Sequence, residues 1–88
     1  MTDVPRVLVL WTTPGCGPCE EALEALRRVQ ARVAFTLDVR GLLSAPADFR
    51  LRHRYDIPLL LEGDRVLCRH RVDEQGLERL LRGTPVAD

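Results

Sequence analysis

Residues 7–19 read Val-Leu-Val-Leu-Trp-Thr-Thr-Pro-Gly-Cys-Gly-Pro-Cys, and this stretch decides the fold. Residues 6–11 form a nearly continuous apolar run, which is typical of a strand buried on both faces. Residues 12–15 are turn formers that end the strand. Apolar residues then recur at three- and four-residue spacing, which predicts an amphipathic helix from about residue 17 to residue 32. A buried strand therefore passes directly into a helix at a pair of cysteines.

The remainder of the chain supplies three more strands and two more helices, within one domain of residues 1–88. The first two strands are joined by a helix and must run parallel with a right-handed crossover. The third and fourth strands form an antiparallel hairpin. The fold class is therefore α/β, a four-stranded mixed sheet with helices on both faces. The expected elements are a second strand at 34–39, a short helix at 46–53, a third strand at 57–61, a turn at 62–65, a fourth strand at 66–71 and a final helix after an N-cap at Asp73.

Composition excludes several classes of function. The chain has 88 residues, 45% of them apolar and 30% charged, as in a soluble globular protein. Thirteen acids balance thirteen bases, so no bulk positive field attracts nucleic acid or anionic lipid. All the bases are arginines, which rules out a lysine Schiff base.

The N-terminus lacks the pattern of a signal peptide, and the first apolar run is too short to span a bilayer. We therefore expect a cytoplasmic protein with no membrane partner. We also expect a monomer, because no long apolar face demands a partner. In a reducing compartment, a close cysteine pair indicates redox or metal chemistry more than a structural crosslink.

The motif Cys16-Gly17-Pro18-Cys19 is the one specific signal for chemistry. The amides at a helix N-terminus favour a negative sulfur and lower the pKa of a thiol from about 8.5. Cys16 is expected outside the helix and exposed, and Cys19 inside the first turn and shielded. Two intervening residues allow the sulfurs to bridge. Pro18 suits the start of a helix, and Gly17 leaves room for a partner to approach Cys16.

These positions predict disulfide exchange with no cofactor beyond the dithiol itself. Cys16 as thiolate would attack a target disulfide, and Cys19 would then attack Cys16 and release the reduced target. Half of a zinc site is the alternative interpretation, as is an inert pair. Zinc normally needs four ligands, so no metal is expected. The chain has no second cysteine pair. The other candidate ligands are Cys68, His53 and His70.

Residues 7–19 resemble the opening of a glutaredoxin or thioredoxin. Thr-Pro-Gly-Cys is glutaredoxin-like, and Cys-Gly-Pro-Cys is the thioredoxin form of the site. The resemblance covers essentially the whole chain and implies a thioredoxin fold, with strand order 3-1-2-4 as these families number their minimal sheet. It also implies protein disulfides or small-molecule thiols as substrates. A reductase or glutathione would be the electron donor.

Asp56-Ile57-Pro58 resembles the segment that carries a cis-proline opposite the active site in these families. The resemblance implies that a cis bond at Pro58 turns the backbone of Ile57 toward Cys16. Ile57 would then offer its amide and carbonyl to an extended substrate, as an added strand would. The alternative is a proline that only begins the third strand.

The chain also departs from these families. Leu10 stands where thioredoxins carry a buried acid, and Gly15 stands where they carry tryptophan. Residues 67–70 lack the glycine pair of glutathione-binding glutaredoxins. A second hypothesis therefore remains, a binding module whose cysteine pair ligates a metal or cluster or which only docks partners. Cys68 is interpreted as an inert packed thiol, with a resolving or regulatory thiol as the alternative. The two histidines are interpreted as surface or structural residues with no visible acid or nucleophile partner.

Overall fold

The computed structural model describes residues 6–83. Residues 1–5 and 84–88 lie outside the described part, and so does most of the N-terminal stretch that bears on a targeting signal. Every element that the sequence predicts is present between these limits. The elements are β1 (Val7–Thr12), α1 (Gly17–Gln30), β2 (Thr36–Gly41), a 3-10 turn (Leu42–Ser44), α2 (Ala47–His53), β3 (Leu59–Glu62), β4 (Arg65–Arg69) and α3 (Glu74–Leu81).

The sheet is mixed, as predicted, and its strands lie in the order β2-β1-β3-β4. β1 and β2 are parallel, whereas β1–β3 and β3–β4 are antiparallel. The 3-1-2-4 order taken from the resemblance is therefore wrong when strands are counted along this chain. The α1 crossover places β2 directly beside β1, and β3 then occupies the free edge of β1.

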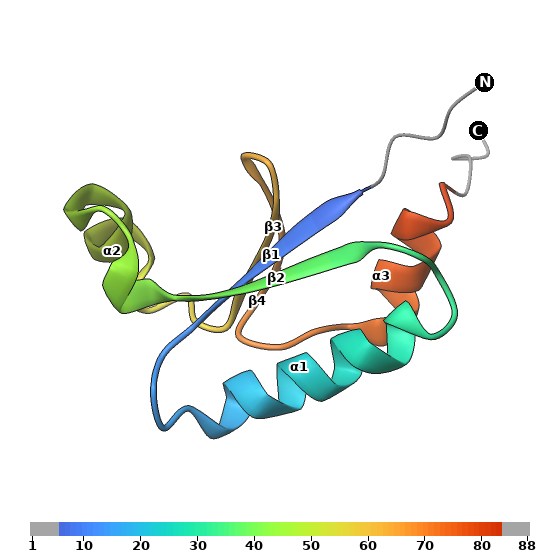
Figure 1. Cartoon of the computed structure of the whole chain (residues 1–88), viewed down its shortest axis with the longest axis horizontal. Helices are drawn as coiled ribbons and strands as arrows, with labels where there is room; N and C mark the ends of the chain where they lie inside the picture. The colour runs from blue at the N-terminus through green and yellow to red at the C-terminus, as the bar shows by residue number, and fades with distance from the viewer. Residues whose placement is uncertain (1–5, 84–88) are drawn as a thin grey trace.

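Helices cover both faces of this sheet, which confirms the predicted fold class (Figure 1). One core lies between the sheet and the pair α1 and α3. A second, smaller core lies on the opposite face, where Phe49 of α2 packs near Trp11 with ring centroids 4.8 Å apart. β1 contributes alternate side chains to both cores and is buried on both faces, as its apolar run predicts. The fully buried residues are Leu8, Leu10, Leu26, Val29, Leu59 and Leu60.

Two strand boundaries differ from the predicted ones for identifiable reasons. β2 spans Thr36–Gly41 instead of 34–39, because its register follows β1 as far as the pair Thr12↔Gly41. β4 ends at Arg69 because His70 adopts a left-handed conformation with φ of 69°. A left-handed residue breaks the extended geometry that a strand requires.

A β-bulge interrupts the hairpin between β3 and β4. Leu60 pairs with Cys68 and Leu61 pairs with Val66, so Leu67 is the extra residue. Leu67 and Cys68, although consecutive, both pack against the core of α1 and α3, while Val66 packs on the opposite face. The bulge therefore turns two neighbouring side chains toward the same face.

Arg6 joins three elements at the end of the sheet where β1 begins. Its guanidinium binds both carboxylate oxygens of Glu62, with Nη2–Oε1 at 2.6 Å and Nε–Oε2 at 2.8 Å. Nη1 also donates to the carbonyls of Leu80 and Leu81 at 3.4 Å, at the C-terminal end of α3. The hydrogen bond from Arg6 holds the pKa of Glu62 below its usual value. A cation near a helix C-terminus is favourable, so Arg6 stabilises the fold through its ion pair with Glu62 and through its contact with the end of α3.

We predict that Glu62→Gln lowers the free energy of unfolding at pH 7 by about 1 kcal/mol, the upper range for a partly exposed ion pair. Because the pKa of Glu62 is lowered in the folded state, its contribution is present above the unfolded pKa of about 4.3. It is lost as the pH falls through the folded pKa. Urea unfolding at pH 7 and at about pH 3 should therefore show a gap between wild type and variant that closes in acid. Glu21→Gln, an exposed change on α1, is the control, and an equal gap at both pH values would contradict the assignment.

Candidate active site

The cysteine pair lies where β1 turns into α1. Cys16 is the N-cap of α1, with extended dihedrals, and its Sγ accepts a hydrogen bond from the backbone N–H of Cys19 at 3.1 Å. Gly17 and Pro18 are the first two helical residues, where proline loses no intrahelical bond. The sulfur of Cys16 thus occupies the position that serine or aspartate oxygens usually fill at a helix start. This contact stabilises negative charge on Cys16 when the pair is reduced.

A disulfide joins Cys16 to Cys19, with 5.2 Å between their Cα atoms. The bridge that the two-residue spacing predicts is therefore confirmed. Cys19 is only 4% exposed, whereas Cys16 is half-buried. The first cysteine is the more accessible of the two, as expected, although it is less exposed than the sequence suggested.

A small pocket of about 170 Å³ opens beside the two sulfurs. Gly15, at its rim, has φ of 71°, a conformation that a tryptophan at this position would adopt only with strain. A Cβ built on Gly17 would meet no atom within 4 Å, so the space above the first helical residue is open. The lining comes from β1, its following turn, α1 and β2: Thr12, Thr13, Gly15, Cys16, Cys19, Glu20, Leu23 and Val39.

The Ile57–Pro58 peptide bond is cis, which confirms the expectation from the resemblance. Pro58 is buried and lies just before β3, and its carbonyl accepts from the N–H of His70 at 2.8 Å. Among the described residues, the backbone N–H and C=O of Ile57 make no hydrogen bond. The lining of the cysteine pocket does not include Ile57 or Pro58, so their role in substrate binding stays a prediction.

Both histidines hold the segment that leads into Pro58. His53 Nδ1 lies 3.0 Å from Asp56 Oδ2, and its ring packs on Phe49 with centroids 4.6 Å apart. His70 Nε2 lies 2.8 Å from the carbonyl oxygen of Tyr55. The expectation that His53 has no acid partner is wrong, and the three-residue spacing to Asp56 was the signal that could have found it. The contact of His70 is to backbone and leaves no mark in the sequence.

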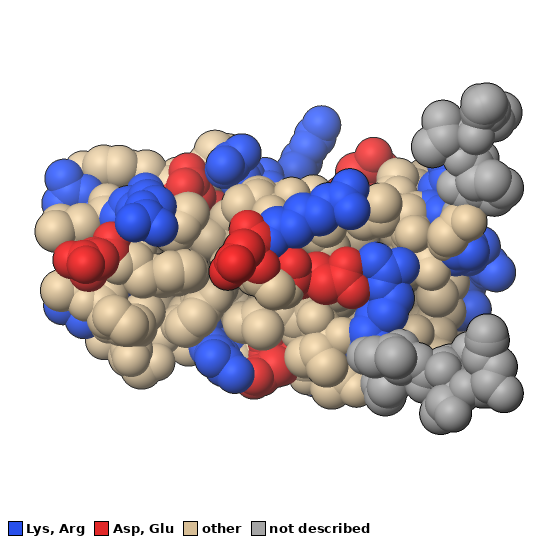
Figure 2. Space-filling view, turned by 90° about the horizontal axis from the view of Figure 1, so that it is seen from above, with Lys and Arg blue, Asp and Glu red and all other residues tan. Residues whose placement is uncertain are grey.

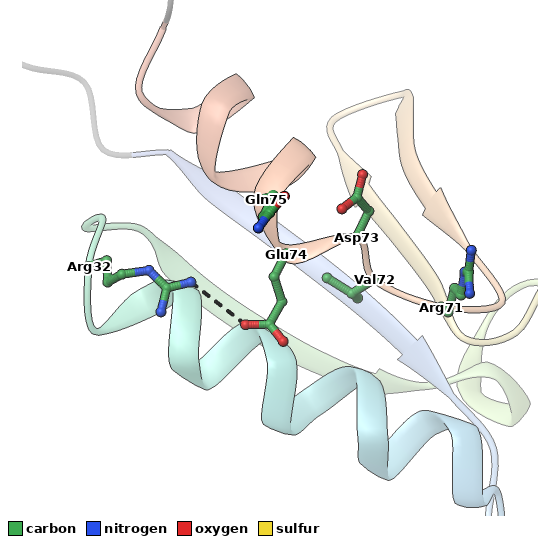
Figure 3. Close-up of a pocket in the computed structure, with 6 residues that line it drawn as sticks. All are labelled: Arg32, Arg71, Val72, Asp73, Glu74 and Gln75. Carbon is green, nitrogen blue, oxygen red and sulfur yellow. Dashed lines mark ion pairs between the residues drawn. The ribbon is translucent and has the colours of Figure 1, made fainter.

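A larger hollow of about 580 Å³ lies at the start of α3, away from the sulfurs (Figure 3). Two of its charged side chains are paired, since Arg32 lies 3.6 Å from Glu74, and Arg32 also lies 2.6 Å from Glu78. Asp73 is the N-cap residue of α3, as predicted, but its side chain makes no capping hydrogen bond. These ion pairs join the turn after α1 to α3, and the lining of this hollow contains no cysteine.

Two findings on the described residues bear on the other hypotheses. Within residues 6–83, no three side chains of His, Cys, Asp or Glu gather in a group that could hold a metal ion. None of the helices described there is both long and apolar enough to cross a membrane.

Cys68, the third cysteine, lies in β4 and is half-buried. Burial raises the pKa of the Cys68 thiol, and a backbone hydrogen bond at Asp73 opposes that effect only in part. A raised pKa leaves less thiolate at neutral pH and therefore a less reactive sulfur. This agrees with the interpretation of Cys68 as a packed, inert thiol.

Comparison with known proteins identifies the family. Residues 7–82 match the family described as Glutaredoxin-like domain (DUF836). The chain belongs to this family, and its fold is thioredoxin-like. No curated protein is significantly similar to it.

Two solved structures share the whole architecture. The solution structure of protein Ne2328 from Nitrosomonas europaea is 28% identical, with a TM-score of 0.71 over 92% of this chain and 96% of that one. The X-ray structure of protein XcR50 from X. campestris is 23% identical, with a TM-score of 0.70 over 89% of this chain and 99% of that one. The second likeness concerns the fold alone.

We predict that the thiols differ in reactivity when the protein is reduced. In Cys19→Ser, which leaves two thiols, iodoacetamide should modify Cys16 at least about tenfold faster than Cys68 at pH 7, because a thiolate is the reacting species. The rate at Cys16 should rise with pH around a midpoint below about 8.5. Mass spectrometry of the two cysteine peptides over time measures both rates.

Cys19→Ser with Cys68→Ala is the matched control and should keep the same rate at Cys16. Equal rates at Cys16 and Cys68 would contradict the assignment of Cys16 as the activated sulfur. A midpoint above 8.5 would contradict the effect of the helix N-terminus.

Proposed function

We propose that this protein is a thiol–disulfide oxidoreductase that works through Cys16 and Cys19. The observation that carries the proposal is the disulfide at the start of α1, with one sulfur half-buried beside a pocket and the other almost fully buried. Family membership supports the same chemistry. The dithiol itself is the redox group, so no separate cofactor is required.

The proposed reaction has two displacements. The Cys16 thiolate attacks one sulfur of a target disulfide, which forms a mixed disulfide and releases the other target sulfur as a thiolate. The Cys19 thiolate then attacks Cys16 Sγ, which forms the Cys16–Cys19 disulfide and releases the second target sulfur. The target gains two electrons, and its two thiolates take up protons from solvent. An external dithiol or thiol returns the two electrons and regenerates the reduced pair.

The residues around the pair have separate roles in this proposal. Pro18 fixes the first helical turn, so Cys19 stays within reach of Cys16. Gly17 leaves open space for the target sulfur to approach. Ile57, whose amide and carbonyl make no hydrogen bond among the described residues, would pair with an extended target chain, and cis-Pro58 sets its backbone direction.

The proposed setting is the reducing cytoplasm, where a reductase or glutathione would supply electrons for transfer to protein or small-molecule disulfides. Ligation of a metal or cluster is the competing use of the pair. In the disulfide form each sulfur is bonded to the other, so neither is a thiolate that could ligate a metal. Metal binding would therefore be confined to the reduced form.

We predict that wild type reduces insulin disulfides and that Cys16→Ser abolishes the activity, because no other thiol can start the exchange. Cys19→Ser should instead accumulate a mixed disulfide at Cys16, since the resolving sulfur is absent. Thioredoxin reductase with NADPH in one cuvette and glutathione in another will identify the donor. Intact mass spectrometry measures the trapped adduct.

Cys68→Ser is the matched control and should retain wild-type turnover. Equal activity in wild type and Cys16→Ser would refute the proposal. Near-stoichiometric zinc or iron in protein purified with reductant, lost in both Cys16→Ser and Cys19→Ser, would favour metal ligation instead.

A further inference from the structure

An uncovered apolar surface lies over α2. Among the described residues five large apolar side chains are exposed, and three belong to one short segment: Leu43 at 69%, Leu51 at 66% and Tyr55 at 78%. α2 itself contains no buried residue and is attached to the sheet mainly through Phe49. Apolar side chains clustered in this way are typical of a surface that another molecule covers.

The arginines at the end of α2 lack acidic partners. Arg52 and Arg54 are exposed, and within residues 6–83 neither forms an ion pair. Arg54 lies over the ring of Tyr55 at 4.8 Å, and Asp48 makes no ion pair although it lies four residues before Arg52. Arginine side chains and an acidic side chain are both exposed at the left end of Figure 2, where α2 lies. We call Leu51, Arg52, Arg54 and Tyr55 the α2 patch.

Several other arginines have carboxylate partners, whereas Arg27, Arg65 and Arg71 form no ion pair within residues 6–83. Arg28 binds Glu74 at 2.7 Å, and Arg40 binds Asp38 at 2.7 Å. The α2 patch thus combines large exposed apolar side chains with two arginines that have no carboxylate partner. A complementary partner would supply carboxylates and apolar side chains together.

α2 lies at the same end of the molecule as the start of α1, which carries the cysteine pair (Figure 1). β2 connects the two features, because Val39 lines the cysteine pocket and Gly41, at the end of β2, leads into the segment before α2. Tyr55 also lies directly before the segment 56–58 and is tied to β4 through His70. A target protein that extends from Cys16 along this end of the sheet would reach the α2 patch.

We propose that the α2 patch docks an acidic, apolar segment of the protein that carries the target disulfide. The inference rests on the proposed function and narrows its substrate class to protein disulfides flanked by carboxylates. Arg52 and Arg54 pair with these carboxylates, and the apolar side chains of the segment cover Leu51 and Tyr55. Glu20, which lines the cysteine pocket, and Glu21 are exposed at the start of α1. They repel the carboxylates of this segment and so favour its path over α2.

Two peptides test the inference. Both contain one disulfide-bonded core and one apolar flank, which carries glutamates in the first peptide and lysines in the second. Rates of reduction are normalised to that of bis(2-hydroxyethyl) disulfide, which is neutral and too short to reach α2. Binding is measured separately by fluorescence polarisation, with each peptide's cysteines replaced by serine.

We expect wild type to favour the acidic peptide by about fivefold in normalised kcat/KM and in affinity, as two exposed charge pairs would give. The preference should shrink as salt rises. The double variant Arg52→Glu with Arg54→Glu should lose or reverse the preference for the acidic peptide. Arg27→Glu, which reverses the charge of one arginine on α1, should keep that preference. Leu51→Ser should weaken the affinity for both peptides, because the apolar flank is common to them.

The outcomes separate the two proposals. Reduction of the small disulfide with no preference between the peptides would overturn the docking surface alone. If none of the three disulfides is reduced, the oxidoreductase proposal is overturned. The polarisation measurement then decides the docking surface. Concentration-dependent dimers abolished by Leu51→Ser would also overturn the inference, because a second copy of this chain would then cover the patch.

Discussion

The hydrogen bond from the N–H of Cys19 to the sulfur of Cys16 unites the local structure with the proposed chemistry. The backbone amides in the first turn of a helix have no intrahelical partner. Here the amide of Cys19 donates to the sulfur of Cys16. The same contact holds the second cysteine against the first at bridging distance. The geometry that caps the start of α1 is therefore also the geometry that the proposed exchange of sulfur bonds requires.

The rest of the fold keeps that junction in place. β1 is flanked by strands on both sides and covered by a core on each face, so its end is fixed where α1 starts. At the other end of the sheet, Arg6 joins the start of β1 to Glu62 of β3 and to the last turn of α3. A small domain with limited burial benefits from such a polar contact, because its core alone supplies modest stability.

Local patterns predicted β1, α1 and the bridging cysteines because each depends on residues close in sequence. The register of β2 could not be predicted in this way, since pairing with β1 decides which residues become strand. The ion pair of Arg6 with Glu62 spans 56 positions and carries no periodic signal. The same applies to the exposure of Leu51, because an apolar residue on a short helix is expected inside until the packing shows otherwise.

The β-bulge at Leu67 has a consequence for how molecules of this protein meet one another. β4 is an outer strand, and a regular outer strand offers unpaired amides and carbonyls to any neighbouring sheet. The extra residue breaks that row and twists it. β2, the opposite outer strand, carries Asp38 and Arg40, whose charges would have to be desolvated by an incoming strand. Both margins of the sheet thus resist the strand-to-strand association that leads to aggregates.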